Sequence, residues 1–112
     1  MKNNRNDVFE IMRSANPELY RLITYAPTPV QEALYSLYHQ YGADYTNPNN
    51  KGLFNSSGKE RYHYDTDRII NALKNKDYKQ VAELIRNYDK TYKKRRNREA
   101  DYIINNLNLK NE

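Results

Sequence analysis

The densest concentration of chemically active side chains is a run of positive charge near the C-terminal end. Residues 90–98 include six basic side chains and no acidic one, although the chain of 112 residues has a net charge of only +5. Like charges on neighbouring helical turns repel each other, so a surface without a partner seldom collects so many. We therefore expect a site for a polyanion or an acidic protein surface, with a solvated stretch of helix as the alternative. The six residues are Lys90, Lys93, Lys94, Arg95, Arg96 and Arg98.

Helical geometry extends this basic run toward the N-terminus. At about 100° per residue, Lys79, Arg86, Lys90 and Lys93 fall opposite the apolar stripe of a single helix. Such a row would follow the axis for roughly 21 Å and meet several phosphates, which lie about 3.4 Å apart along one strand of a duplex. A charged face opposite an apolar face is, however, normal for any surface helix. The predicted phosphate contacts are Lys79, Arg86, Lys90, Lys93, Lys94, Arg96 and Arg98, with Asn87 and Asn97 as additional hydrogen-bonding groups.

A second segment alternates basic and aromatic side chains. It contains Lys59 and Arg61, followed by Tyr62 and Tyr64. Aromatic rings stack on unpaired bases while cations hold the backbone, as in many proteins that bind single strands. Tyr62 and Tyr64 are therefore candidates for base stacking. The alternative is that Phe54, Tyr62 and Tyr64 cover the helical core as a lid.

Tyrosine is abundant, with 12 in the chain. Tyrosine is enriched at protein interfaces because its ring provides contact area at a low entropic cost. Tyr35 is predicted to face outward from a helix, next to His39. This pair is a candidate surface for a partner or for self-association, and ordinary packing between helices is the alternative.

Catalysis has little support in the sequence. His63, Asp65 and Asp67 are the closest approach to a metal or acid–base cluster, but their spacing matches no metal motif, and both carboxylates suit the start of a helix. The chain has no cysteine, which excludes thiolate metal sites and cysteine nucleophiles. Its three glycines do not have the spacing of a phosphate-binding loop. We predict a protein without enzymatic activity, metal or cofactor.

Composition predicts one small folded domain. Leu, Ile, Val and Phe make up just under a fifth of the chain, a share that borders on disorder when net charge is high. Here the net charge is small, and tyrosine rings add apolar bulk. We expect one helical domain over residues 1–112, with short polar tails at 1–6 and 108–112. No apolar run is long enough to cross a membrane and no signal peptide is evident, so the predicted location is the cytoplasm or a virion.

Capping signals predict four to five helices. Each signal is followed by apolar residues at steps of three and four. Gly42 should end the third helix. The last helix should be the longest, with its continuity through residues 93–99 left open because they contain no apolar residue. The signals are Asp7, Asn16 with Pro17, Thr28 with Pro29 and with Gln31 in a capping box, Asp65 with Thr66, and Asp77.

Residues 43–65 interrupt the helical pattern. They contain two glycines, a proline and several asparagines, which favour an irregular loop. The alternative is a short hairpin that pairs Leu53 and Phe54 with Tyr62 and Tyr64. The expected fold is thus an all-α bundle with a long C-terminal helix and an irregular aromatic loop.

Two functions from different classes fit these observations. The first is a small nucleic-acid-binding protein of phage or plasmid type, because its abundant Asn, Lys, Tyr and Ile have A/T-rich codons and its basic helix suits phosphates. The second is a protein–protein interaction module, such as a virion component or an inhibitor that docks on an acidic host protein. A homo-oligomer or larger assembly fits the second function best, and a membrane fits neither.

Overall fold

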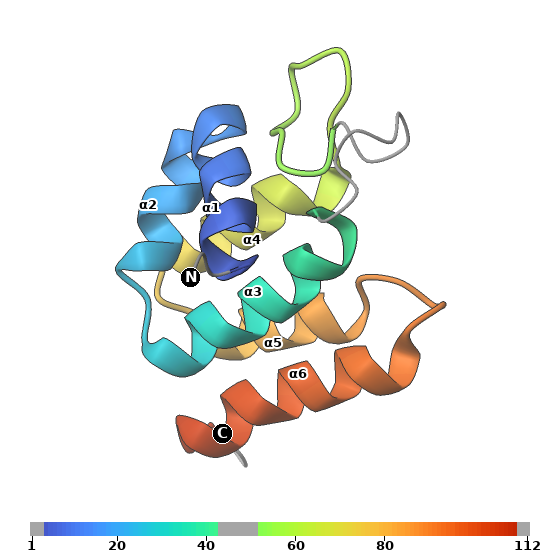
Figure 1. Ribbon diagram of the computed structural model, residues 1–112. Helices are drawn as coiled ribbons and strands as arrows, with labels where there is room; N and C mark the ends of the chain where they lie inside the picture. The colour runs from blue at the N-terminus through green and yellow to red at the C-terminus, as the bar shows by residue number, and fades with distance from the viewer. Residues whose placement is uncertain (1–3, 43–51, 110–112) are drawn as a thin grey trace.

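Six helices make up most of the computed structural model, which describes residues 4–42 and 52–109 (Figure 1). The expected all-α fold is confirmed, with one helix more than expected. Across these two ranges there is no strand, and no helix is long and apolar enough to cross a membrane. The helices are α1 (Asn4–Ala15), α2 (Pro17–Thr24), α3 (Thr28–Gly42), α4 (Tyr64–Lys74), α5 (Tyr78–Arg86) and α6 (Lys93–Asn106).

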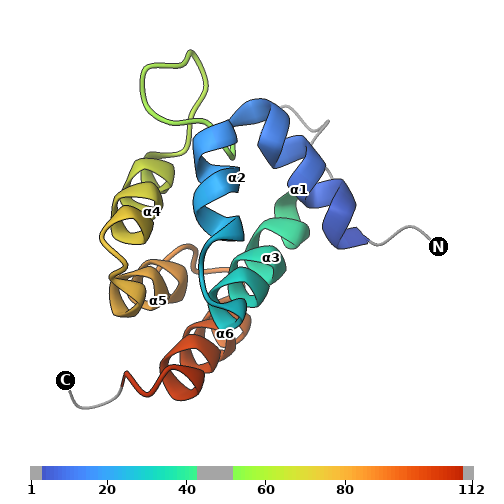
Figure 2. The same cartoon turned by 90° about the vertical axis from the view of Figure 1, so that its left-hand side faces the viewer.

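Helix α3 is the centre of the arrangement and packs against α1, α2, α5 and α6. Helices α5 and α6 run in opposite directions and form the most extensive helix pair (Figure 1). Figure 2 shows α4 and α5 on one side of α2, α1 on the other side, and α6 across the base. The C-terminal pair therefore closes the bundle beneath α3.

Tyrosine contributes to the core, as the composition suggested. Tyr38 of α3 is fully buried and meets the edges of two other buried rings, Phe54 at 5.1 Å and Tyr88 at 6.4 Å between ring centres. Burial raises the pKa of the Tyr38 hydroxyl. Phe54 comes from the loop before α4, so for this ring the lid interpretation is confirmed.

Two predicted helix starts are confirmed by their hydrogen bonds. The Asn16 side chain accepts a hydrogen bond from the Leu19 amide, and Pro17 occupies the first position of α2. The Asp77 side chain accepts one from the Gln80 amide at the start of α5. Both bonds satisfy amide groups that the first turn of a helix leaves without a partner.

Both ends of the chain are more structured than expected. Helix α1 begins at Asn4, before Asp7, so residues 4–6 are helical and the predicted polar tail is wrong there. At the other end Leu109 packs against the core. The remaining tail positions, 1–3 and 110–112, lie outside the described residues.

Helix α3 begins at Thr28 and ends at Gly42, as predicted, but not through the predicted capping box. The Pro27 carbonyl accepts hydrogen bonds from the amides of Val30 and Gln31. The Gln31 side chain donates to carbonyls of the preceding turn, at Thr24 and Ala26. Gln31 thus joins α2 to α3 instead of reaching back to the first amide of its own helix.

Helix α4 begins two residues earlier than predicted. Its cap is His63, whose Nδ1 accepts a hydrogen bond from the Asp65 amide at 3.1 Å. Asp65 therefore lies in the first turn beside Asp67, where the helix dipole favours acidic side chains. The assignment of Asp65 as the cap was wrong.

The predicted long C-terminal helix is two helices, α5 and α6. Tyr88 turns into the core after α5 ends, and the Asp89 side chain accepts a hydrogen bond from the Tyr92 amide at 3.0 Å, where α6 starts. The reversal lets α6 bury Ala100 and Ile103 against the rest of the bundle, whereas a straight continuation would carry them away from it. The continuous basic row of about 21 Å therefore does not form.

The loop before α4 is closed by Asn55 and not by a strand ladder. Its carbonyl accepts a hydrogen bond from the His63 amide at 3.3 Å, and its side chain donates to the Arg61 carbonyl at 2.9 Å. A Cβ atom at Gly52 would lie 2.7 Å from the Tyr62 amide nitrogen, so this close approach requires glycine. The hairpin alternative is wrong for residues 52–63, and residues 43–51 lie outside the described residues.

Asn16 joins this loop to the start of α2 and offers a test of the fold. It is buried, caps Leu19, and donates hydrogen bonds to the Phe54 carbonyl at 2.9 Å and to Ser56 Oγ at 3.1 Å. Asn16→Ala should lower the free energy of unfolding by about 1–3 kcal/mol, because a cap is lost and a buried carbonyl is left without its donor. Urea unfolding followed by circular dichroism measures this. Asn105→Ala, at an exposed position of α6, should change little, and equal stability of the two variants would contradict the role of Asn16.

Candidate polyanion-binding site

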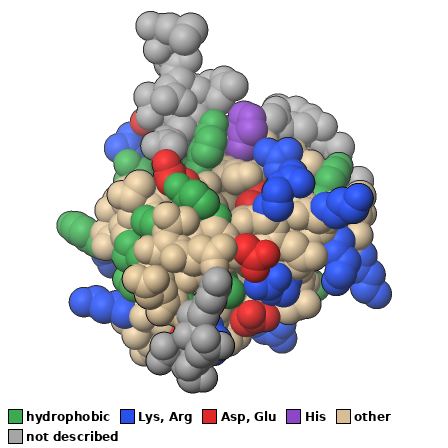
Figure 3. Space-filling view, turned by 90° about the horizontal axis from the view of Figure 1, so that it is seen from below, with side chains coloured by type: hydrophobic (Ala, Val, Ile, Leu, Met, Phe, Trp, Pro, Cys, Tyr) green, Lys and Arg blue, Asp and Glu red, His purple; other side chains and the backbone are tan. Residues whose placement is uncertain are grey.

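Exposed basic side chains gather where the chain turns from α5 into α6. Lys90 lies in the turn, Lys93 and Lys94 in the first turn of α6, and Arg98 one helical turn later. In the space-filling view of Figure 3, Lys and Arg side chains are concentrated on the right-hand side, which is the side of the α5–α6 turn in Figure 1. We call this group the basic surface. It consists of Lys90, Lys93, Lys94, Arg95 and Arg98, all exposed.

The basic surface includes an electrostatically unfavourable helix start. The first turn of α6 contains four consecutive basic residues, 93–96, and no acidic one. Its cap residue, Tyr92, makes no capping hydrogen bond with its side chain. The positive end of the helix dipole disfavours cations, and the cations repel one another. A bound anion would offset both effects, since amide groups at a helix start bind anions.

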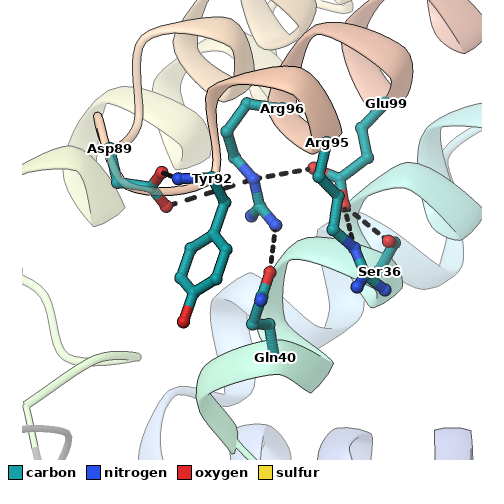
Figure 4. A network of polar contacts seen from close by, with 7 residues as sticks. All are labelled: Ser36, Gln40, Asp89, Tyr92, Arg95, Arg96 and Glu99. Atoms are coloured by element: carbon teal, nitrogen blue, oxygen red, sulfur yellow. Dashed lines mark hydrogen bonds and ion pairs between the residues drawn. The ribbon is translucent and has the colours of Figure 1, made fainter.

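Arg96 is the exception in this run, because it is fully buried and points into the protein (Figure 4). Its Nη2 donates a hydrogen bond to Gln40 Oε1 on α3, and its Nε lies 3.2 Å from Glu99 Oε1 and 4.0 Å from Asp89 Oδ2. The prediction that Arg96 contacts phosphate is therefore wrong. Its spacing is the sequence feature that indicates burial, because Arg96 lies four residues before Ala100 on the buried stripe of α6.

Glu99 is the acidic centre of the same network and is only 6% exposed. Its carboxylate accepts a hydrogen bond from Ser36 Oγ on α3 and lies 3.7 Å from Arg95 Nε. Burial raises the pKa of Glu99, while Ser36, Arg96 and Arg95 oppose that rise. Glu99 and Arg96 thus attach the start of α6 to α3 by charge and hydrogen bonds.

Replacing Arg96 should separate its structural role from a role in binding. Arg96→Ala should lower the free energy of unfolding by about 3–5 kcal/mol, because Glu99 would be left as a buried charge without its partner. Arg98→Ala removes the same charge from an exposed position and should stay within about 0.5 kcal/mol of the wild type. Urea unfolding at neutral pH measures both. Equal stabilities would show that Arg96 is not part of the fold's buried network.

Arg86 and Lys79, the other two predicted contacts, lie outside the basic surface. Arg86 is half-buried, and its Nη2 lies 2.9 Å from Asp101 Oδ1 while its Nη1 donates to Asn97 Oδ1 at 3.2 Å. It therefore joins α5 to α6 and is already neutralised. Lys79 is exposed, but it lies at the start of α5, the end away from the turn.

Tyr35 does not face outward as predicted. It is half-buried, meets the edge of the Phe9 ring of α1 at 5.9 Å and stacks on His39 at 5.3 Å. Tyr35 and His39 therefore take part in helix packing, which was the alternative considered for them.

Tyr62 and Tyr64 do not act as a lid, because their exposed fractions are 51% and 61%. The His63 ring lies between two tyrosine rings, 4.9 Å from Tyr64 and 4.5 Å from buried Tyr88, and is nearly parallel to both. Tyr88 precedes Lys90 by two residues. This three-ring stack, Tyr64–His63–Tyr88, therefore brings the aromatic loop to the edge of the basic surface, a contact that sequence spacing does not indicate.

The acidic residues near His63 have separate partners. Asp65 lies 3.2 Å from the Arg68 guanidinium, whereas Asp67 accepts hydrogen bonds from the amide and hydroxyl of Ser57. The Ser57 hydroxyl lowers the pKa of Asp67. Within the described ranges there is no group of three His, Cys, Asp or Glu residues that could hold a metal ion.

His63 makes the stability of the loop depend on pH. Burial lowers the pKa of His63 from its ordinary value of 6.5, and Asp65 partly opposes this. The unfolded chain then binds the proton more readily, so the His63 contribution is complete above about pH 6.5 and is lost as pH falls below it. His63→Asn keeps a capping group but cannot titrate. Between about pH 7.5 and about pH 5, its unfolding free energy should fall less than that of the wild type, as urea unfolding measures; equal falls would contradict this.

Comparison of the chain with protein family models, with curated proteins and with solved structures finds no match. The function is therefore argued from the basic surface and the ring stack.

Proposed function

We propose that this chain is a small nucleic-acid-binding protein that holds phosphates with its basic surface. The observation that carries the proposal is the division of the basic residues near α6. Arg86 and Arg96 are neutralised by carboxylates inside or between helices. Four exposed cations, in contrast, take part in no ion pair among the described residues: Lys90, Lys93, Lys94 and Arg98.

A polymer of phosphates suits this surface better than a single small anion. The cations extend from the α5–α6 turn along the outer side of α6, over more than one helical turn. Several phosphates in a row can neutralise them together, and each contact releases condensed counterions from the nucleic acid. The protein would act in the cytoplasm of a host cell or within a virion, and it needs no catalytic group.

Docking on an acidic protein is the competing function, and it would use the same cations. Its second predicted surface was Tyr35 with His39 on α3, but Tyr35 packs against Phe9 of α1 and His39 stacks on Tyr35. The exposed tyrosine rings are spread over the α2–α3 turn, the aromatic loop and α6. Because the exposed tyrosines of the described residues form no continuous face for a protein partner, we favour nucleic acid.

Salt dependence tests this proposal. Binding of a fluorescein-labelled duplex of about 12 base pairs, measured by polarisation, should weaken with a log–log slope of roughly −4 if about four phosphates are engaged. The double variant Lys93→Ala, Lys94→Ala should lower the affinity and reduce the slope by about 2.

The matched control is Arg21→Ala with Lys79→Ala, which removes the same charge from exposed positions on α2 and α5, away from the basic surface. Its slope should equal that of the wild type. No binding of either this duplex or a single strand of the same length at about 50 mM salt would overturn the proposal. An equal loss in both double variants would show attraction by net charge and not by the basic surface.

A further inference from the structure

We propose that the bound nucleic acid is single-stranded, and that unpaired bases stack on Tyr64, in a hollow between α4 and α5, and on the neighbouring Tyr62. This inference rests on the proposed function, because the basic surface holds the phosphates of the same strand. The argument combines the ring stack, the chemistry of the hollow and the position of both beside the α5–α6 turn.

Tyr64 is a rigid and accessible stacking platform. Its ring is 61% exposed, yet it is the outer member of the three-ring stack whose inner member, Tyr88, is buried. Because the ring is already fixed in place, little conformational freedom is lost when a base stacks on it. Tyr62 adds a second exposed ring, two residues earlier in the chain.

Arg68 covers Tyr64 only loosely. Its guanidinium carbon lies 5.5 Å from the centre of the Tyr64 ring, and its side chain is 63% exposed. A cation–π contact at an exposed site is weaker than stacking between a base and an aromatic ring. A base can therefore take this position, while Arg68 stays beside it through its ion pair with Asp65.

The hollow next to Tyr64 suits a base and not a phosphate. It has a volume of about 270 Å³, just below the usual range for drug-sized ligands of about 300–1,000 Å³. Asp65 and Glu83 contribute carboxylates, each beside one arginine, Arg68 at 3.2 Å and Arg86 at 3.7 Å. Their remaining oxygen positions disfavour phosphate but accept hydrogen bonds from base N–H groups, the N3–H of thymine included. Gln80 and Asn87 contribute side-chain amides, which read base edges.

The hollow and the basic surface are close to each other along the chain. Asn87 lines the hollow and caps the end of α5, and Lys90 lies three residues later in the turn. A strand that places a base against Tyr64 can thus place its next phosphates on Lys90 and Lys93. A duplex keeps its bases paired and stacked inside, so only an unpaired strand can use both features together.

Binding of a labelled oligothymidine of about 12 nucleotides tests the inference. Tyr64→Ala should lower its affinity about 5- to 100-fold, the effect expected for one stacked base, whereas Tyr64→Phe keeps the ring and should bind like the wild type. The salt slope should not change, because no charge is removed. The affinity for a duplex should also stay unchanged. So should the inhibition constant of inorganic polyphosphate, which has no bases, when it competes with the labelled strand.

Each failure has a distinct outcome. Loss of oligothymidine binding in Lys93→Ala, Lys94→Ala but not in Tyr64→Ala or Tyr62→Ala would overturn base stacking and leave the proposed function intact. No binding of any polyanion would overturn both. If Tyr64→Ala loses affinity for polyphosphate by the same factor as for oligothymidine, the ring acts on the fold and not on a base. If circular dichroism shows that Tyr64→Ala is unfolded, Tyr62→Ala decides, since its ring is exposed and makes no ring contact among the described residues.

Discussion

The buried ion pair between Arg96 and Glu99 is the constraint on which the C-terminal half depends. Removing both charges from water is costly, and the cost is offset only when good geometry and further hydrogen bonds surround the pair. Here Gln40 and Ser36 of α3 supply the hydrogen bonds, and Asp89 of the preceding turn adds a second carboxylate 4.0 Å from Arg96 Nε. Because these groups come from fixed places, the pair determines which side of α6 faces α3. The remaining cations of the first turn are consequently directed to solvent.

Asp89 connects this pair to the chain reversal. Its side chain accepts a hydrogen bond from the Tyr92 amide at the start of α6 and also lies near the Arg96 guanidinium. The same carboxylate therefore belongs both to the turn and to the buried network. On the other side of the turn, Tyr88 is buried against Tyr38 and stacks on His63. One short turn thus brings the aromatic loop, the core and the basic surface into contact. A straight helix through the same residues would have separated all three.

Sequence signals predicted what depends on neighbours in the chain. Asn16 and Asp77 cap helices because each side chain meets an amide three residues ahead, a relation that spacing alone reveals. Arg96 was misassigned because the phase of α6 was extrapolated from α5, whereas the turn resets it. The stack between His63 and Tyr88 joins residues 25 positions apart, which no local pattern indicates. The exposed lysines of the candidate site were found from charge density, and their separation from Arg86 and Arg96 required the fold.

The start of α6 departs from a rule that α2, α4 and α5 obey, and α3, which has no acidic residue in its first turn, has no basic one there either. Helix α2 has an acidic residue and a side-chain cap in its first turn, α4 has two acidic residues there, and α5 is capped by Asp77. Helix α6 has four basic residues instead, and no side-chain cap. Conflicts between local preference and global fold are expected at functional sites, where the favourable interaction comes from a ligand. The charge of Arg96 is compensated inside the protein by Glu99. Negative charge that compensates Lys93 and Lys94 therefore has to come from a ligand. A phosphate chain along α6 supplies negative charge at the point where the helix dipole and the crowded cations both produce a positive potential.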